Sequence, residues 1–387
     1  MATAPLYSRR SVRALATALV LTLLAATAFA ARAEALPARF WGAVPQSSLS
    51  TEQLNRLSRG GVESIRIPVE WGAIQPQQGG PISWADTDAI VERAAIAGVD
   101  VLPTVTGAPR WAVPLVNVPG GGGVKAPAHL PTSGAGLAGW KELLRQAVER
   151  YGPGGQFWTA HPLVPERPIR TWQIWNEPNF RYFVAKPNPK EYGQLMKVTY
   201  PVVRAADPGA QLILAGLFSQ PKNSRHLEMV GRKAKLVNRT SRDYFASYFL
   251  EQMYKTNPGI KSRFSGVALH PYASSWHKLT GLIEEVRTVL ARSGDAAKGL
   301  WLTELGWSSG TGNAFSKGPA GQARELKAAF KLLLQKQARW RVQRVYWFSV
   351  DDAVGVCNFC DGSGLFGNGF KPKKSWYEYV KFTGGQP

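Results

Sequence analysis

Short apolar runs recur eight times along the chain and alternate with longer segments in which apolar and polar residues are mixed. Most of these runs are continuous rather than alternating, which is typical of strands that are covered on both faces. They lie at residues 39–44, 64–69, 100–105, 170–175, 211–216, 264–269, 300–305 and 344–349. The pattern predicts eight buried β-strands.

The segments between these runs have the period of amphipathic helices. In residues 136–152 an apolar stripe recurs at helical spacing, formed by Leu137, Trp140, Leu144, Ala147, Val148 and Tyr151. Residues 279–294 and 323–337 repeat that spacing, and several helices end on a glycine shortly before the next strand. Eight strand-then-helix steps without a linker or repeat predict an α/β fold, a single (β/α)8 TIM barrel. An open doubly wound sheet is the alternative.

The first 34 residues have a different composition from the rest. A basic stretch at 7–13 precedes an apolar run at 14–30, and Ala28-Phe29-Ala30 offers a small-residue cleavage site. This three-part pattern predicts a signal peptide at 1–34 and a folded domain at 35–387. Ser8-Arg9-Arg10 resembles a twin-arginine signal, so Sec and twin-arginine export both stay open. We expect a secreted or cell-wall-associated protein without a stable membrane anchor, because the apolar run is short for a membrane span.

The chain is strongly basic, with a formal net charge of +21. Three of these charges are arginines at 9, 10 and 13, so +18 remains after the signal, with a dense basic segment at 231–242. A solvated basic face without a specific partner is the favoured interpretation of this charge, and attraction to acidic polymers is the alternative. No nucleic-acid-binding module is recognisable, so we expect no nucleic-acid partner, and we expect a monomer.

The cysteines and histidines indicate no metal site. The only two cysteines, Cys357 and Cys360, are predicted to form a disulfide in an exported protein. The five histidines show no metal-ligand spacing, so we expect neither a metal nor an organic cofactor. The string GSGLFG at 362–367 matches a dinucleotide-binding pattern, but it opens no βαβ unit and is interpreted as a turn.

Polar residues cluster at the ends of the predicted strands. The carboxyl ends of all eight strands meet at one face of a barrel, so residues far apart in sequence become neighbours there. These positions hold Arg66, Asn176, Glu177, His270, Tyr272, Glu304 and Trp347. Two facing carboxyl groups are what glycoside hydrolysis requires, one protonated and one ionised. For either glutamate alone, an ion pair with Arg66 or a lysine is the alternative.

Two of these strand ends resemble a known group of enzymes. IWNEPN and WLTELGW resemble the acid/base and nucleophile motifs of clan A retaining glycoside hydrolases, most closely family 5 (cellulase-like) and family 39 (xylosidase-like). Residues 64–105, ALHPY and GLFGNGFKPKKSWYEY resemble further segments of the clan, so the similarity covers essentially all of 38–383.

The resemblance implies a role for each matching residue. Glu177 is the expected general acid/base and Glu304 the expected nucleophile, with Asn176 binding the hydroxyl next to the anomeric carbon. His270 and Tyr272 are expected to orient Glu304, Arg66 to support it, and Trp347 to form the floor under the sugar. Family 5 often has a histidine after the third strand, where this chain has Arg110-Trp111.

The expected activity is therefore a secreted retaining hydrolase acting on β-glycosidic bonds of a polysaccharide or oligosaccharide, including an acidic one. A transglycosylase would use the same residues. A catalytically retired barrel, or a purely electrostatic binder of anionic polysaccharide, is the alternative.

Overall fold

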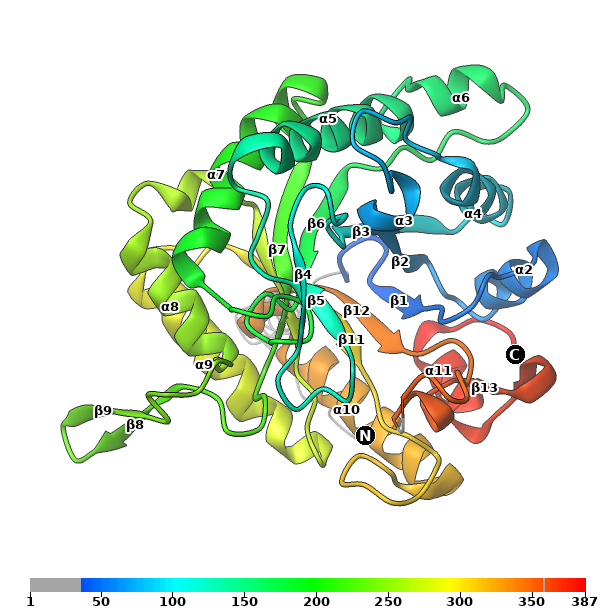
Figure 1. Cartoon of the computed structure of the whole chain (residues 1–387). Coiled ribbons are helices and arrows are strands. Elements are labelled where there is room, and N and C mark those ends of the chain that lie inside the picture. The colour runs from blue at the N-terminus through cyan, green and yellow to red at the C-terminus, as the bar shows by residue number, and fades with distance from the viewer. Residues whose placement is uncertain (1–35, 358) are drawn as a thin grey trace, which may run out of the picture. The chain divides into compact units, whose positions relative to one another are not determined.

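Eight parallel strands close into a barrel in the computed structural model, in the order β1-β12-β11-β10-β7-β6-β3-β2 (Figure 1). The strands are β1 (Trp41–Val44), β2 (Ser64–Glu70), β3 (Asp100–Thr106), β6 (Thr171–Asn176), β7 (Gln211–Phe218), β10 (Gly266–His270), β11 (Gly299–Leu305) and β12 (Val342–Phe348). Each coincides with a predicted strand to within a few residues, so the predicted single TIM barrel is confirmed. The structure describes residues 36–357 and 359–387, so the predicted signal peptide lies outside it and stays a prediction.

A helix follows each barrel strand before the next one begins. They are α2 (Thr51–Arg59), α4 (Ala85–Ile96), α5 (Gly134–Tyr151), α7 (Pro189–Ala206), α8 (Ala246–Thr256), α9 (Leu279–Arg292), α10 (Gly318–Trp340) and α11 (Lys374–Thr383), with short helices α3 (Trp71–Ile74) and α6 (Gln156–Ala160). Local sequence sets their ends: Ser50 caps α2 in a capping box with Gln53, and the Asn188 side chain caps α7 ahead of Pro189. None of the helices in the described ranges is both long and apolar enough to cross a bilayer.

Side-chain alternation along the strands builds two apolar layers. A small inner cluster comprises Val44, Leu102, Ile213, Ala268, Trp301 and Tyr346. Their strand neighbours, such as Leu300 and Leu302 beside Trp301, belong to the large cluster that includes the helices. The interior of the barrel is therefore a packed core, and chemistry is confined to its mouth.

Three two-stranded hairpins extend from the loops. β4 (Leu115–Asn117) and β5 (Lys125–Pro127) follow β3, and a backbone hydrogen bond from Ala185 to Pro127 attaches them to the loop after β6. β8 (His226–Val230) and β9 (Lys233–Val237) project away from the barrel and carry much of the basic segment noted above (Figure 1). β13 (Phe366–Gly367) pairs with β14 (Lys371–Pro372) near the C-terminus.

Candidate active site

Arg66 on β2 connects three strands at the mouth of the barrel. Its Nη1 donates to Glu304 Oε1 at 2.7 Å, its Nη2 to Asn176 Oδ1 at 2.6 Å, and its Nε to Gln173 Oε1 at 3.1 Å. The guanidinium is buried, and its planar donors satisfy three side chains at once. Arg66 therefore fixes the position of Glu304 relative to the end of β6.

The end of β6 departs from regular strand geometry, and this departure aims its polar residues inward. Trp175 and Glu177 have positive φ values of 69° and 41°. Trp175 joins the outer cluster next to Ile174 and packs 5.8 Å from Trp140 of α5, so it breaks the alternation of the strand. Asn176 consequently reaches Arg66, and the next residue, Glu177, reaches His270. Positive φ is costly for such residues and is typical of functional sites.

A register shift in β11 places Glu304 at the mouth. The pairing of β11 with β12 is irregular between Leu302 and Leu305, both of which pack in the outer cluster. Thr303 and Glu304 lie between these two outward-facing leucines, and both contact groups inside the barrel. Strict alternation would have turned Glu304 toward the helices.

His270 lies between the two glutamates. Its Nδ1 is 2.6 Å from Glu177 Oε1 and 3.5 Å from Glu304 Oε2, and its Nε2 is 3.0 Å from Thr303 Oγ1. The ring packs against Gly216 of β7, where a Cβ would collide with it. Burial, followed by the positive charge of Arg66, lowers the pKa of His270 well below its usual value. The imidazole is therefore neutral, and the Thr303 hydroxyl complements either tautomer because it can donate or accept.

The two carboxylates face each other at short range. One oxygen of Glu177, one oxygen of Glu304 and a nitrogen of His270 all lie within 4.8 Å of one another. Burial, followed by the charge of Glu304, raises the pKa of Glu177 well above its usual value, and Arg66 opposes this shift. Tyr272 donates its hydroxyl to Glu304 Oε2 at 2.7 Å. One carboxyl group is thus favoured as an acid, while the other receives two donors suited to a carboxylate.

These same three side chains, Glu177, His270 and Glu304, are of types that bind metals. The cationic position next to Glu304, however, is taken by the Arg66 guanidinium. The arrangement fits proton transfer and nucleophilic attack better than metal binding.

Trp347 does not reach the cleft, so the prediction that it forms the floor under the sugar is wrong. Its side chain is fully buried in the outer cluster, its ring lies 6.3 Å from Phe330 of α10, and its Nε1 donates to the carbonyl of Ser363. The next residue, Phe348, is half-buried, and its ring is edge-on to Tyr272 at 6.2 Å. Side-chain alternation in β12 gives the mouth to Phe348 rather than to Trp347.

A disulfide loop adds a second ring beside Phe348. Cys357 and Cys360 are bonded, as predicted. Phe359 stacks on Phe348 with ring centroids 5.8 Å apart, and it meets Tyr272 edge-on at 5.3 Å. The disulfide therefore constrains the aromatic side chain that its loop places against Tyr272 and Phe348.

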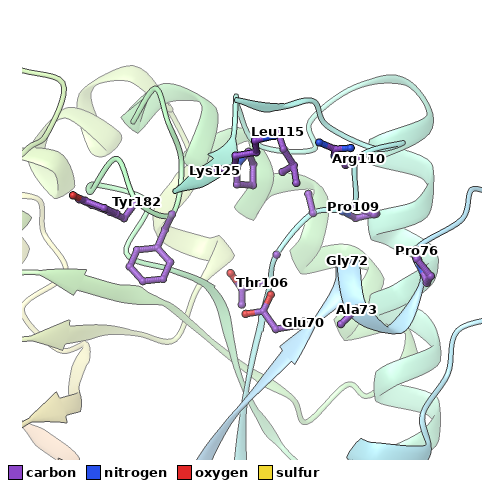
Figure 2. Close-up of a pocket in the computed structure, with 14 residues that line it drawn as sticks. Glu70, Gly72, Ala73, Pro76, Thr106, Pro109, Arg110, Leu115, Lys125 and Tyr182 are labelled. Carbon is purple, nitrogen blue, oxygen red and sulfur yellow. The ribbon is translucent and has the colours of Figure 1, made fainter. Parts of the chain in front are cut away.

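A pocket of about 580 Å³ lies at the same end of the barrel as the carboxylate pair. Figure 2 shows Glu70 and Thr106 on its floor, Tyr182 on one side, and Leu115, Lys125 and Arg110 along its upper rim. Neither Glu177 nor Glu304 lines it. Its floor lies at the mouth of the barrel, because Glu70 is paired with Thr106 at the ends of β2 and β3, and β2 also carries Arg66.

The structure brings six of the seven predicted site residues into one network: Arg66, Asn176, Glu177, His270, Tyr272 and Glu304. Their individual roles stay predictions. Two supporting residues were not predicted: Gln173, which accepts from Arg66, and Thr303, which contacts His270. Both are polar residues inside apolar strands, and this was the available signal.

Comparisons with known proteins agree with this geometry. A family model described as glycosyl hydrolase catalytic core matches residues 166–377, which include both glutamates. No curated protein sequence matches the chain.

Solved structures show the same barrel at low identity. A family 39 glycoside hydrolase from Bacteroides cellulosilyticus has 20% identity and a TM-score of 0.56, over 90% of this chain and 64% of its own. A monomeric β-xylosidase from Caulobacter crescentus has 18% identity and a TM-score of 0.59, over 89% and 68%. A family 5 (subfamily 18) protein from Streptomyces cattleya has 14% identity and a TM-score of 0.60, over 86% and 74%. This chain thus spans less than two thirds of the first of these.

Proposed function

This chain belongs to the glycosyl hydrolase catalytic core family, and on that premise we propose that it is an O-glycosyl hydrolase, specifically a secreted retaining β-glycosidase. The observation that carries the proposal is the approach of the Glu177 and Glu304 oxygens to within 4.8 Å. Retaining enzymes hold their carboxyl groups about 5–5.5 Å apart, whereas inverting enzymes need about 6.5–9.5 Å to admit a water molecule.

The proposed first step is attack on the anomeric carbon by Glu304. Arg66 and Tyr272 each hold one of its oxygens, which favours the ionised form and aims it. Glu177 gives its proton to the leaving oxygen as the glycosidic bond breaks, and a covalent glycosyl-enzyme results. The raised pKa of Glu177 keeps that proton available near neutral pH.

In the proposed second step, the ionised Glu177 removes a proton from water, which attacks the same carbon and releases the sugar with its original configuration. Asn176 supports both steps. Its Oδ1 is held by Arg66, and its Nδ2 makes no hydrogen bond within the described ranges, so it stays available to a sugar hydroxyl.

Export is a separate part of the proposal. Its support is the three-part pattern of residues 1–34, together with a disulfide that persists in an oxidising compartment. N-terminal sequencing of the protein recovered outside expressing cells would test it. A mature terminus near Ala30 is expected, and an intact Met1 would contradict it.

A substrate panel tests the activity. β-Glucan, mannan, xylan, galactan and a uronic-acid polymer are incubated with the wild type, Glu177→Gln and Glu304→Gln, and the anomer released first is followed by NMR. We expect one class to be cut with release of the β-anomer, and both variants to lose at least about 100-fold in rate. Release of the α-anomer would refute the retaining mechanism. Tight sugar binding without turnover by the wild type would instead establish a retired barrel.

A further inference from the structure

The walls of this pocket come from β2 and from the loop after β6, which also carry Arg66 and Glu177. Glu70 follows Arg66 on the same face of β2, about 13 Å further along at roughly 3.3 Å per residue. Tyr182 and Phe183 follow Glu177 in the loop after β6 and form the opposite wall. A glycan chain with its scissile bond at Glu177 and Glu304 therefore has a neighbouring space in which to place another unit. The volume, about 580 Å³, lies within the range of ligand sites.

The β4–β5 hairpin covers the outer side of this pocket. Leu115, Lys125 and Pro127 of the hairpin line it, and the hairpin packs on Ala185 through Val118 and Ala126. The wall is thus anchored to the loop that also carries Tyr182.

The charges in this pocket are separated. Arg110 and Lys125 lie on the rim and form no ion pair with any carboxylate of the described residues (Figure 2). The Glu70 side chain lies on the floor and makes no hydrogen bond in the described part of the chain. Its carboxylate rests where a Cβ on Gly107 would collide with it, and the residue is exposed, so its oxygens are open to a ligand. The pocket therefore offers two free cations at one end and a free acceptor at the other.

We propose that this pocket binds a uronic-acid unit of the substrate polymer. This rests on the proposed glycosidase function and names its substrate class. The sugar carboxylate would contact Arg110 and Lys125, and ring hydroxyls would donate to Glu70 and Thr106. A neutral sugar would use the floor but leave both cations unpaired. The net charge of +18 outside the signal adds a long-range attraction for an anionic polymer.

Matched substrates separate this proposal from general activity. A neutral β-glucan and the same glucan oxidised at C6 to carboxylate give one backbone with and without the acid. We expect the wild type to have the higher kcat/KM on the oxidised form. The double variant Arg110→Gln/Lys125→Gln should lower the ratio of acidic to neutral kcat/KM about tenfold, because it removes the two charge-assisted contacts to the sugar carboxylate.

The control removes the same charge elsewhere. Arg232 and Lys235 lie on the projecting β8–β9 hairpin, and Arg232→Gln/Lys235→Gln should leave the ratio within about twofold of wild type. Any small fall that it causes through long-range attraction should disappear at high salt. An equal fall in both double variants would mean that net charge alone is responsible, and it would overturn the pocket assignment. A wild-type preference for the neutral or a sulfated glucan would overturn it as well.

A binding measurement distinguishes failure of this inference from failure of the proposed glycosidase function. Calorimetry of an oligouronate with Glu304→Gln measures the pocket without turnover. If the wild type cuts no polymer, the glycosidase proposal fails, yet binding that is lost with Arg110→Gln/Lys125→Gln would still support the pocket. If polymers are cut but the oligouronate does not bind, the inference fails and the glycosidase proposal stands.

Discussion

Glutamine at either catalytic position is expected to abolish most of the activity, but with opposite effects on folding stability. Glu177 is buried beside another carboxylate and receives no cation of its own, so Glu177→Gln should stabilise the protein at neutral pH. Glu304 forms a buried ion pair with Arg66, so Glu304→Gln should destabilise it. Glutamine is nearly isosteric with glutamate, so packing changes little in either variant.

The separation of the two carboxylates sets the size of the gain. Two unit charges at the limiting separation of 4.8 Å would repel by about 3 kcal/mol at an effective dielectric constant of 20. Arg66 offsets part of this repulsion and protonation of Glu177 avoids another part, so we expect a gain of about 1–3 kcal/mol. Removing one partner of a buried ion pair costs about 3–5 kcal/mol, and retained hydrogen bonds place Glu304→Gln at the lower end.

The difference should depend on pH. The folded state raises the pKa of Glu177, so it binds that proton more tightly than the unfolded chain does. Wild-type stability therefore falls as pH rises from the unfolded pKa, near 4.3, to the folded one. The advantage of Glu177→Gln is near zero below about pH 4 and grows with pH. Wild-type activity on unactivated glycosides should fall over the alkaline limb that this same pKa defines.

Urea unfolding of the wild type and both variants at pH 4, 6 and 8, followed by tryptophan fluorescence, measures the effect. Rates on an unactivated glycoside should fall by about 10²–10⁴ for Glu177→Gln, which is about 3–5 kcal/mol of barrier. The reasoning is refuted if Glu177→Gln is no more stable than wild type at pH 8, if its advantage is the same at pH 4, or if the variant retains a tenth of the activity.

Three further outcomes are expected. Tyr272→Phe should lower kcat about tenfold or more with little loss of stability, because a hydrogen bond to a charged group contributes about 1.5–3 kcal/mol; an unchanged kcat would contradict its role. Phe348→Ala should raise KM or lower kcat, whereas Trp347→Ala should cost about 3–5 kcal/mol of stability as a core cavity, and the reverse pattern would restore the original prediction for Trp347. Replacing Cys357 and Cys360 by serine should lower kcat/KM but should change the urea midpoint of unfolding little. The loop that they close is short, so its closure contributes little stability, and it lies beside the cleft.

Strand periodicity was enough to predict the barrel, because eight continuous apolar runs separated by amphipathic helices leave few other arrangements. The pairing of Glu177 with Glu304 followed from one topological rule, that the carboxyl ends of all strands meet at one face. Neither prediction required knowledge of any single side-chain direction.

Side-chain direction was where prediction failed. In β12 every residue from Val345 to Phe348 is apolar, so the sequence does not show which of Trp347 and Phe348 faces the mouth. In β11 the inward position of Glu304 depends on an irregular pairing that no residue type announces. The pocket likewise depends on where the β4–β5 hairpin folds back, which composition does not determine.

The division of the carboxylate pair between β6 and β11 has a consequence for how the protein is made. A nascent chain halted before β11 carries the expected proton donor without its partner, so it has no glycosidase activity toward glycans in the cell that synthesises it. Two fragments produced separately, one ending after β7 and one beginning before β10, would each be inert. Turnover would return only on their reassembly, and the split enzyme would then report whether two fused proteins meet.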